Sequence, residues 1–378
     1  MKRKHVALPA LCIVLAALLS QCTHPLQTFR MPSPYAVERI AAQPQGGRPR
    51  NIILMVGDGM SLAAMATAWT ANRGRLNIEN CPVAGLAKTY SANRLLTDSA
   101  AAATAFATGH KAENGHLGLD AGGSPHASIL EIARRHGLSA GLVATCSILD
   151  ATPAAFVAKK DDRHQWADIA AQFAASGVDF VCGGGRAGFT RRQDGRDLAR
   201  VLAGAGYQLP RTIAELETID RGKVFALIAD NDLPAPSERG DALTRAAQKA
   251  IELLGANPRG FFLMIEGSLI DDGGHENRLE RMMDEIHDFD RTAGAVLRWA
   301  AADEETLVVI TSDHETGGWT LLGGDIASGT VKGRFTTDGH SGVMVPVYAF
   351  GPGAEAFTGM FENTDLFAKM LAAFGFGD

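Results

Sequence analysis

Acidic and imidazole side chains stand directly after several apolar runs of this sequence. These positions share ligand atoms of the kind that metal ions bind, and they are Asp58, Asp150 with Thr152, Glu266, and Asp313 with His314. Any one of them could be a turn or capping residue. Crowded carboxylates raise each other's pKa, however, and bound cations relieve that repulsion. The set as a whole therefore predicts a site for more than one metal ion.

Two further segments sharpen this prediction. Asp271 and His275 are four residues apart in "EGSLIDDGGHEN", so one helical turn or tight loop can aim both at one cation. His340 lies in the glycine-flanked segment "TTDGHSG". Mixed Asp and His ligands suit zinc, whereas Glu, Asp and Thr oxygens suit magnesium. Two cations about 4 Å apart can hold both the attacking and the leaving oxygen of an in-line displacement, which indicates phosphoryl transfer.

A candidate nucleophile lies in the segment "TDSAAAATAFATGHKAENG". The alanines that follow Ser99 predict a helix, because alanine is the best helix former. Asp98 and Ser99 could simply cap that helix, since both residue types are common N-caps. Alternatively, Ser99 is a nucleophile placed where the backbone N–H groups of a helix start favour an anion. This segment alone leaves both interpretations open.

The elements that must position these residues alternate between strands and helices. Six apolar runs of strand length lack alternation, which is typical of strands buried on both faces of a parallel sheet: "NIILMVGDG", "SAGLVATCS", "VDFVCGGG", "GFFLMIEGS", "TLVVITSDHE" and "PVYAFGPG". Helical patterns lie between them, in "HASILEIARRHG" and over residues 276–302. We expect an α/β fold, doubly wound, with a mostly parallel central sheet and helices on both faces. Residues 186–257, polar and often interrupted, should decorate the sheet without forming a separate domain.

The composition fits a packed globular protein. Of 378 residues, 46% are hydrophobic and 21% charged, and the net charge of −6 gives no reason to expect nucleic-acid binding. Outside the N-terminal region the cysteines are Cys81, Cys146 and Cys182, with no metal-type spacing. Cys146 and Cys182 lie in apolar surroundings and are expected to be buried free thiols, although one disulfide is an alternative.

The N-terminal region predicts export. Residues 2–4 are basic and precede "VALPALCIVLAALL", which together are typical of a signal peptide over residues 1–21. The segment "LLSQC" resembles a lipobox with Cys22 as the lipidated residue, which predicts a periplasmic or outer-membrane lipoprotein; the alternative is a soluble exported protein. Residues 22–49, rich in Pro, Gln and Gly, predict a tether, and residues 50–378 the catalytic domain.

Six motifs in order resemble those of the alkaline phosphatases, from Asn51 to about the C-terminus: "GDGM", "TDSAAAATAFATGHKAENG", "DATPAAFVA", "EGSLID" with His275 after it, "SDHETGG" and the His340 loop. The resemblance implies a ligand set for two zinc ions and one magnesium ion. Its members are Asp271, His275 and His340 for the first zinc, Asp58, Asp313 and His314 for the second, and Asp58, Thr152 and Glu266 for the magnesium, with Asp150 nearby through water.

The resemblance also implies a phosphate-binding arginine and a reaction. Arg163, thirteen residues after Asp150, would grip phosphate oxygens, and Asp98 would orient it. Without the resemblance, "KKDDRHQ" would be interpreted as a solvated charged run. The implied activity is hydrolysis of phosphate monoesters through a phosphoserine at Ser99, with release of inorganic phosphate. A homodimer is a further implication.

Two departures from the family pattern carry predictions. Asp272 stands where many bacterial relatives have a basic or aromatic residue, which predicts weaker phosphate retention and a stronger hold on magnesium. Only a short segment separates His314 from His340, so a crown insertion is reduced or absent, and an open site is expected. Because the crown contributes to the dimer in larger relatives, the sequence leaves open whether this chain forms the dimer of the family.

Competing functions are other enzymes of the same fold and a protein without catalysis. A sulfatase would need a C/S-x-P-x-R motif, whereas Ser99 is followed by "AAAA". A phosphomutase is another such enzyme, and a phosphodiesterase would give no reason for an Arg163–Asp98 pair. A metal- or phosphate-binding lipoprotein without activity would be expected to have lost at least one of Ser99 and the zinc ligands.

Overall fold

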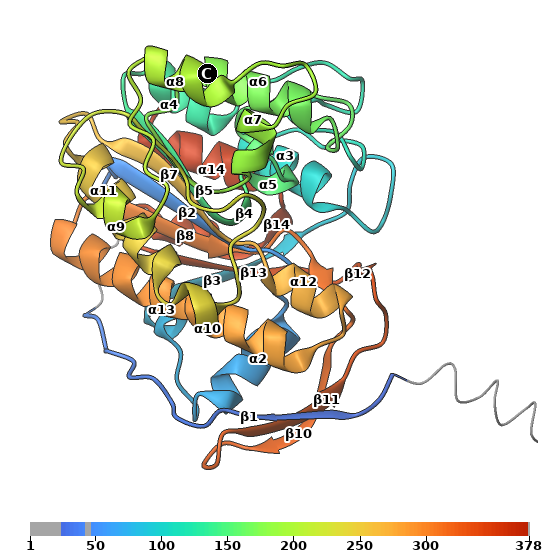
Figure 1. Ribbon diagram of the computed structural model, residues 1–378. Helices are drawn as coiled ribbons and strands as arrows, with labels where there is room; N and C mark the ends of the chain where they lie inside the picture. Colours follow the sequence, from blue (N-terminus) through green and yellow to red (C-terminus); the bar gives the residue numbers. More distant parts are fainter. Residues whose placement is uncertain (1–23, 42–46, 377–378) are drawn as a thin grey trace, which may run out of the picture.

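A nine-stranded sheet lies at the centre of the computed structural model, which describes residues 24–41 and 47–376 (Figure 1). The predicted signal peptide and Cys22 fall outside the described residues. The strand order in the sheet is β14-β3-β13-β8-β2-β7-β4-β5-β6. The bounds are β2 (Asn51–Gly57), β3 (Val83–Lys88), β4 (Ser139–Ser147), β5 (Phe180–Gly184), β6 (Val224–Leu227), β7 (Phe261–Gly267), β8 (Thr306–Thr311), β13 (Val345–Phe350) and β14 (Gly359–Glu362).

The six strands from β8 to β6 pair in parallel, and five of them, β8, β2, β7, β4 and β5, are among the continuous apolar runs that predicted parallel strands. The sixth run, "PVYAFGPG", forms β13, and the prediction of a parallel strand is wrong there. Every residue of β2, β7 and β8 is buried, because helices cover both faces of the sheet. Strand β13 runs antiparallel to both of its neighbours, whereas β14 and β3 are parallel. The expectation of a mostly parallel α/β sheet is confirmed.

Helices form a layer on each face of this sheet (Figure 1). One layer holds α3 (Ser99–Thr108), α4 (Ile129–Arg135), α5 (Ala151–Ala155), α6 (Trp166–Ser176), α7 (Arg186–Thr190), α8 (Leu198–Gly204) and α14 (Asp365–Phe374). The other holds α2 (Leu62–Ala71), η1 (Asn77–Asn80), α9 (Ile213–Glu217), α11 (Ala242–Gly255) and α13 (Leu279–Asp303). Helix α13 corresponds to the helix that was predicted over residues 276–302. Shorter elements are α10 (Pro236–Arg239), α12 (Ile270–His275) and η2 (Ala354–Phe357).

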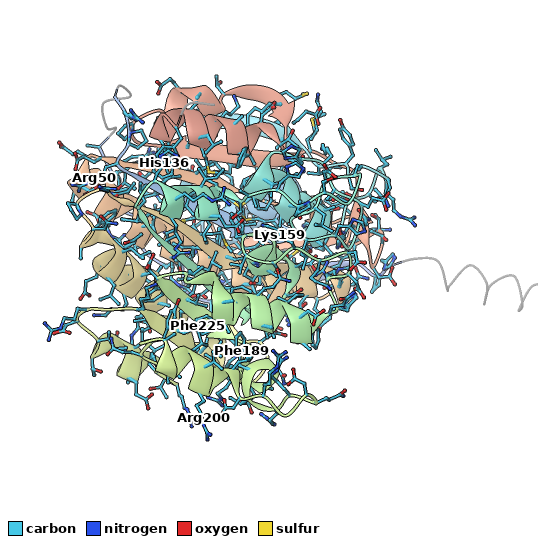
Figure 2. The ribbon with its side chains drawn as sticks, turned by 90° about the horizontal axis from the view of Figure 1, so that it is seen from above. Arg50, His136, Lys159, Phe189, Arg200 and Phe225 are labelled. Carbon is cyan, nitrogen blue, oxygen red and sulfur yellow. The ribbon has the colours of Figure 1, made fainter. Side chains whose placement is uncertain are left out.

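Residues 186–257 join the sheet instead of forming a separate unit. They contribute the edge strand β6, which the sequence did not reveal, and helices α7 to α11. Phe189 of α7 and Phe225 of β6 lie close together in Figure 2, with ring centroids 5.2 Å apart in the core on this side of the sheet. The region was predicted only to decorate the sheet, whereas it also supplies one of the strands.

A small second sheet brings the N-terminal arm, residues 24–41, onto the domain. Its order is β1-β11-β10, with β1 (Gln27–Arg30), β10 (Thr320–Asp325) and β11 (Thr330–Arg334). The hydroxyl of Tyr35 donates to Asp290 Oδ2 at 2.6 Å, and its amide donates to Asn72 Oδ1 at 2.9 Å. Although composition suggested a tether, this described part of residues 22–49 is docked through strand pairing and side-chain hydrogen bonds.

The short segment between His314 and His340 consists of β9 (Glu315–Thr316) and the β10–β11 hairpin, and β9 pairs with β12 (His340–Ser341).

Cys146 and Cys182 are buried free thiols, as predicted, and Cys81 is also free. Among residues 24–41 and 47–376, no helix combines the length and the apolar character that crossing a bilayer requires.

Candidate active site

Ser99 is the first residue of α3, and its hydroxyl is not used to cap the helix. The cap is Asp98, whose Oδ1 accepts the amide of Ala101 at 3.0 Å. Ser99 is 4% exposed, and its Oγ lies 3.2 Å from Nε2 of His314. Every residue of α3 is buried, so the alanines let this helix pack closely against α5. Each interpretation of the segment therefore applies to one of the two residues: Asp98 caps the helix, and Ser99 faces the ligand cluster.

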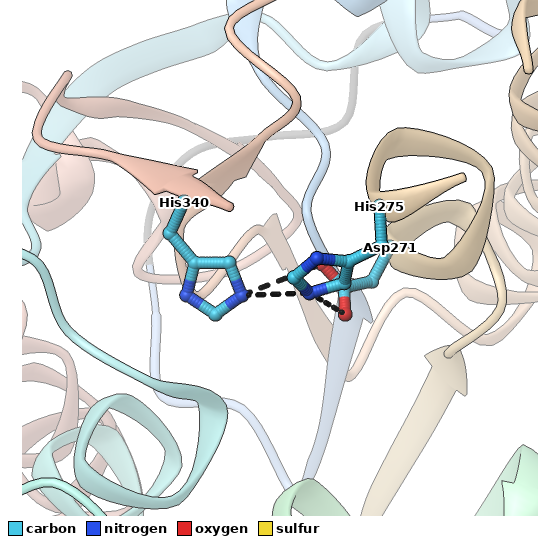
Figure 3. Close-up of side chains that lie close together, drawn as sticks. All are labelled: Asp271, His275 and His340. Atoms are coloured by element: carbon cyan, nitrogen blue, oxygen red, sulfur yellow. Dashed lines mark hydrogen bonds and ion pairs between the residues drawn. The ribbon is translucent and has the colours of Figure 1, made fainter. Parts of the chain in front are cut away.

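The predicted zinc ligands form two groups at the carboxyl ends of the strands. Asp58, Asp313 and His314 follow β2 and β8, and their ligand atoms lie within 4.8 Å of one another. The second group brings together residues from two separate elements: Asp271 and His275 come from α12, and His340 comes from β12 (Figure 3). The rings of His314 and His340 stack with centroids 3.5 Å apart, so the two groups adjoin.

Oxygen atoms of the chain fix the orientation of all three histidine rings. Nδ1 of His275 lies 2.6 Å from the carbonyl of Asp338, and Nδ1 of His340 lies 2.7 Å from the carbonyl of Thr97. A carbonyl only accepts, so both Nδ1 atoms carry the proton. Nε2 is therefore the atom that each ring turns toward the ligand cluster, where a metal would bind it. Without a metal ion, the hydrogen bond to Asp271 raises the pKa of His275 to about 9, so Nε2 of His275 also carries a proton at neutral pH.

Thr316 extends this arrangement across both groups. Its hydroxyl donates to Asp271 Oδ1, and its oxygen lies 3.1 Å from Nδ1 of His314. With the hydroxyl proton committed to Asp271, the threonine oxygen accepts from the imidazole, and Nε2 of His314 is left unprotonated. The sequence did not single out Thr316, although it lies inside "SDHETGG", because hydroxyl residues beside metal ligands have no distinctive spacing. The contacts of His275 and His340 with the carbonyls of Asp338 and Thr97 could not be predicted, because backbone carbonyls are the same at every position of a sequence.

Buried polar atoms without hydrogen bonds show that this pocket suits cations. Oδ1 of Asp58, Oδ2 of Asp313 and Oγ1 of Thr152 are buried and have no hydrogen-bond partner within the described residues. Burial, and then the neighbouring carboxylate of Asp313, raises the pKa of Asp58 well above its ordinary value. Burial likewise lowers the pKa of His314 to about 4. Metal ions would satisfy these atoms and neutralise the repulsion.

Glu266 brings a further buried carboxylate to the same place. It lies in β7 between β2 and β4, and burial together with the charge of Asp150 raises its pKa to about 8. Thr152 belongs to α5, which packs against β7. Asp150 caps α5 and is half exposed, with Oδ1 2.8 Å from Arg163. This donor set is one of oxygens, which suits magnesium.

Arg163 is not a solvated charge. Its side chain is 19% exposed and makes two ion pairs, at 3.3 Å to Asp98 and at 2.8 Å to Asp150. Burial by itself would lower the pKa of Arg163, but the carboxylates of Asp150 and Asp98 outweigh burial and raise it. Oδ2 of Asp98 also accepts the amide of Gly115 at 3.0 Å. The guanidinium is thereby held beside the start of α3.

Asp272 has a partner that the sequence did not suggest. Oδ2 of Asp272 lies 2.6 Å from the guanidinium of Arg281, in the first turn of α13. Burial raises the pKa of Asp272, while Arg281 opposes that rise. The guanidinium of Arg281 therefore offsets part of the negative charge that Asp272 brings near the phosphate. The predicted effect of Asp272 on phosphate and magnesium binding stays a prediction.

Comparisons with known proteins point to one family. The family model described as alkaline phosphatase matches residues 49–334. Alkaline phosphatase 4 of Bacillus subtilis strain 168 is 31% identical, over 84% of this chain and 87% of the relative. Streptomycin-6-phosphate phosphatase of Streptomyces griseus is also 31% identical, over 89% of this chain and 93% of the relative.

Solved structures give the same answer for the fold. The alkaline phosphatase from the Antarctic bacterium TAB5 superposes with a TM-score of 0.84 at 38% identity, covering 88% of this chain and all of that one. A mutant of the TAB5 enzyme with a histidine replaced by aspartate has magnesium bound, and it matches with a TM-score of 0.83 at 36% identity over 88% and 100% of the two chains.

Proposed function

The chain belongs to the alkaline phosphatase family of metal-dependent enzymes, and we propose that it hydrolyses phosphate monoesters through a phosphoserine at Ser99. One observation carries the proposal. The hydroxyl of Ser99, at the start of α3, is not used in capping and donates to Nε2 of His314 at 3.2 Å, beside a cluster of buried carboxylates. A nucleophile in this place sits at a helix N-terminus and next to a cation site, both of which favour its deprotonated form.

We propose two zinc ions and one magnesium ion for the three ligand groups. The first zinc would be held by Asp271, His275 and His340, the second by Asp58, Asp313 and His314, and the magnesium by Asp58, Thr152 and Glu266, with Asp150 contributing through water. These ions supply charge neutralisation and activation of oxygen nucleophiles. The orphaned atoms of Asp58, Asp313 and Thr152 support this assignment.

The residues of the chain then perform two displacements. Ser99 gives up its proton to solvent and attacks phosphorus, so that a bond from Oγ to phosphorus forms as the bond to the ester oxygen breaks. The departing alcohol takes up a proton from solvent. Water next loses a proton and attacks the same phosphorus, the bond to Oγ breaks, and Oγ takes up a proton, which leaves inorganic phosphate and free Ser99. Throughout, Arg163 donates to two non-bridging oxygens, and Asp98 keeps the guanidinium in place.

Measurements on metal content and substrate class test this function. We expect metal ions in the purified enzyme, rapid hydrolysis of an aryl phosphate monoester, and slow hydrolysis of the matching diester. Chelation should remove monoesterase activity. Activity that survives complete chelation, or that favours the diester, would contradict the proposal and would favour a phosphodiesterase of the same fold.

Export and lipidation at Cys22 are proposals from the sequence. The basic residues 2–4, the apolar run and "LLSQC" support them. Mass spectrometry of the protein from membranes of the producing cells should find a diacylglyceryl group on Cys22, and Cys22→Ala should release the enzyme into the soluble exported fraction. An unmodified Cys22 in the mature protein would contradict lipidation.

A further inference from the structure

Helix α12 carries two of the three ligands proposed for the first zinc, and it is short. It spans the six residues from Ile270 to His275, and α13 begins at Leu279. A helix of this length has no stability of its own in water, because nucleation costs more than so few hydrogen bonds return. The direction in which Asp271 and His275 point is therefore decided by contacts from outside the helix.

One arginine bonds to the residue after each ligand. Arg281 reaches back from the first turn of α13, and its guanidinium donates to Asp272 at 2.6 Å and to Glu276. Asp272 follows Asp271 in the chain, and Glu276 follows His275. The planar guanidinium thus connects the two ends of the helix segment that presents the metal ligands, with a fixed fork geometry that a single ammonium group lacks.

The backbone of α12 leaves little room for compensation. A Cβ added at Gly273 would lie 2.6 Å from the amide nitrogen of Met282, so α12 rests directly on the start of α13. From the N-terminal arm, Gln27 fixes the intervening turn, donating to the carbonyl of Asn277 at 2.6 Å and accepting the amide of Leu279 at 3.0 Å. Both contacts hold the turn. Arg278 bonds to Glu276 alone, at 3.3 Å, whereas Arg281 bonds to side chains at both ends of the ligand-bearing segment.

We propose that Arg281 is a positioning residue for the first metal site, fixing the rotation of α12 at which Asp271 and His275 converge on His340. This inference rests on the proposed function, because it assumes a metal at that cluster. The ion pairs are partly exposed, with 24% exposure at Arg281 and 42% at Glu276. Pairs of this kind contribute little to folding stability, so the effect belongs to the geometry of the site and not to the stability of the fold.

The sign of the effect separates positioning from simple electrostatics. Arg281→Gln removes a positive charge close to a proposed cation site. If Arg281 acted only through its charge, the variant would bind zinc more tightly, because a repulsive charge has been removed. If Arg281 positions the ligands, the variant binds zinc more weakly in spite of that gain, since misaligned ligands lose coordination.

The test is a zinc titration of the full chain against a competing chelator, together with zinc content after dialysis. We expect Arg281→Gln to lower the affinity for one of the zinc ions by about tenfold. This is the lower end of the effect that residues in contact with metal ligands have on metal affinity. Arg281→Lys, which keeps the charge but not the fork, should be intermediate. The matched control is Arg298→Gln, which removes an exposed arginine of the same helix whose ion pair, at 3.9 Å, is with Glu38. Thermal unfolding of the metal-free proteins should be unchanged in all three variants.

A triple variant shows whether Arg281 acts through Asp272 and Glu276. Asp272→Asn combined with Glu276→Gln should weaken zinc binding, and adding Arg281→Gln should cause no comparable further loss, because it breaks the same two ion pairs. Additive losses, tighter zinc binding in Arg281→Gln, or wild-type affinity in that variant would each overturn the inference while the wild-type enzyme still binds zinc and hydrolyses a monoester. A wild-type protein that neither binds zinc nor hydrolyses the monoester would instead overturn the proposed function itself.

Discussion

Nε2 of His275 faces Nε2 of His340 at a distance of 3.1 Å, although the residues are 65 positions apart. Both rings carry a proton on Nδ1, where each meets a backbone carbonyl. The two Nε2 atoms therefore face each other, with the carboxylate of Asp271 3.3 Å from His275 Nε2. Two unprotonated nitrogens would repel each other at this distance, so either a metal ion lies between them or Nε2 of His275 carries a proton. The hydrogen bond to Asp271 raises the pKa of His275 to about 9, and a bound metal ion would replace that proton.

Removal of metal should therefore abolish activity and lower the melting temperature. Ligand binding to the native state alone stabilises it by about 4 kcal/mol when the free ion is a thousandfold above its dissociation constant. Differential scanning calorimetry before and after chelation, with activity on an aryl phosphate, measures both effects. Zinc and magnesium together should restore them, and calcium alone serves as the control. An unchanged melting temperature after verified metal removal would contradict the assignment.

Replacement of the nucleophile should remove the covalent intermediate. For Ser99→Ala we expect kcat to fall by at least about a thousandfold, as is typical when a nucleophile is lost, and no phosphoenzyme to form. Acid quenching with a radiolabelled monoester detects the phosphoserine directly. Ser91→Ala is the matched control, since Ser91 is also buried but bonds only within its own loop. Phosphoenzyme in Ser99→Ala at the wild-type level would exclude Ser99.

Truncation of the phosphate-binding arginine should weaken binding of both substrate and product. Hydrogen bonds to a charged group contribute about 1.5–3 kcal/mol, so Arg163→Ala should reduce kcat/KM by roughly ten- to a hundredfold. Inorganic phosphate should inhibit more weakly by a similar factor. Arg163→Lys should recover only part of the loss, because an ammonium group does not match two oxygens at once. The control is Arg135→Ala, an arginine in the last turn of α4. Equal phosphate inhibition in Arg163→Ala and the wild type would be incompatible with the assigned role.

Loss of the threonine that joins the two ligand groups should weaken metal binding without removing any ligand. Thr316→Val keeps the side-chain shape but leaves Nδ1 of His314 and Oδ1 of Asp271 without their shared partner. Removal of such outer contacts lowers metal affinity by about 10–100-fold. Chelator competition measures this, and Thr316→Ser, which retains the hydroxyl, should be close to the wild type. A Val variant with wild-type affinity would show that the hydroxyl does not orient His314.

Acid should destabilise the fold through His287, which is not one of the predicted metal ligands. Burial lowers the pKa of His287 to about 4, while its Nε2 donates to the carbonyl of Ala68 at 3.2 Å. The unfolded chain takes up a proton below its ordinary pKa near 6.5, but the native state does so only near 4. Stability is therefore complete above pH 6.5 and falls as the pH drops toward 4, by up to about 3 kcal/mol.

Denaturant unfolding between pH 4 and 7 checks this pH dependence. His287→Gln, which keeps a donor for Ala68, should show a shallower fall with decreasing pH than the wild type. Every other titrating group is common to both proteins, so the difference between the two slopes isolates His287. Parallel slopes would contradict the lowered pKa.

The sequence by itself determined the class of fold and the chemistry of the site. Continuous apolar runs such as "NIILMVG" predicted the parallel strands, because a strand buried on both faces must be apolar at every position. Since parallel strands end at one edge, the polar residues after those runs had to gather there. Three strands of the central sheet were missed. The edge strands β6 and β14 have only four residues each, which carry too little information, and β3 lacks a continuous apolar run because several of its residues are not buried.

Only the tertiary structure decided how the groups are held. Arg163 lies in a run of charges that looks solvated, and its burial follows from contacts with Asp98, 65 residues away. The protonation of the histidines depends on carbonyls that no side-chain pattern encodes. The N-terminal arm looked like a linker, yet Gln27 bonds to the turn behind His275 across 250 residues. Local periodicity determines which residues face a core, whereas partners distant in the chain are determined only when the whole chain has packed.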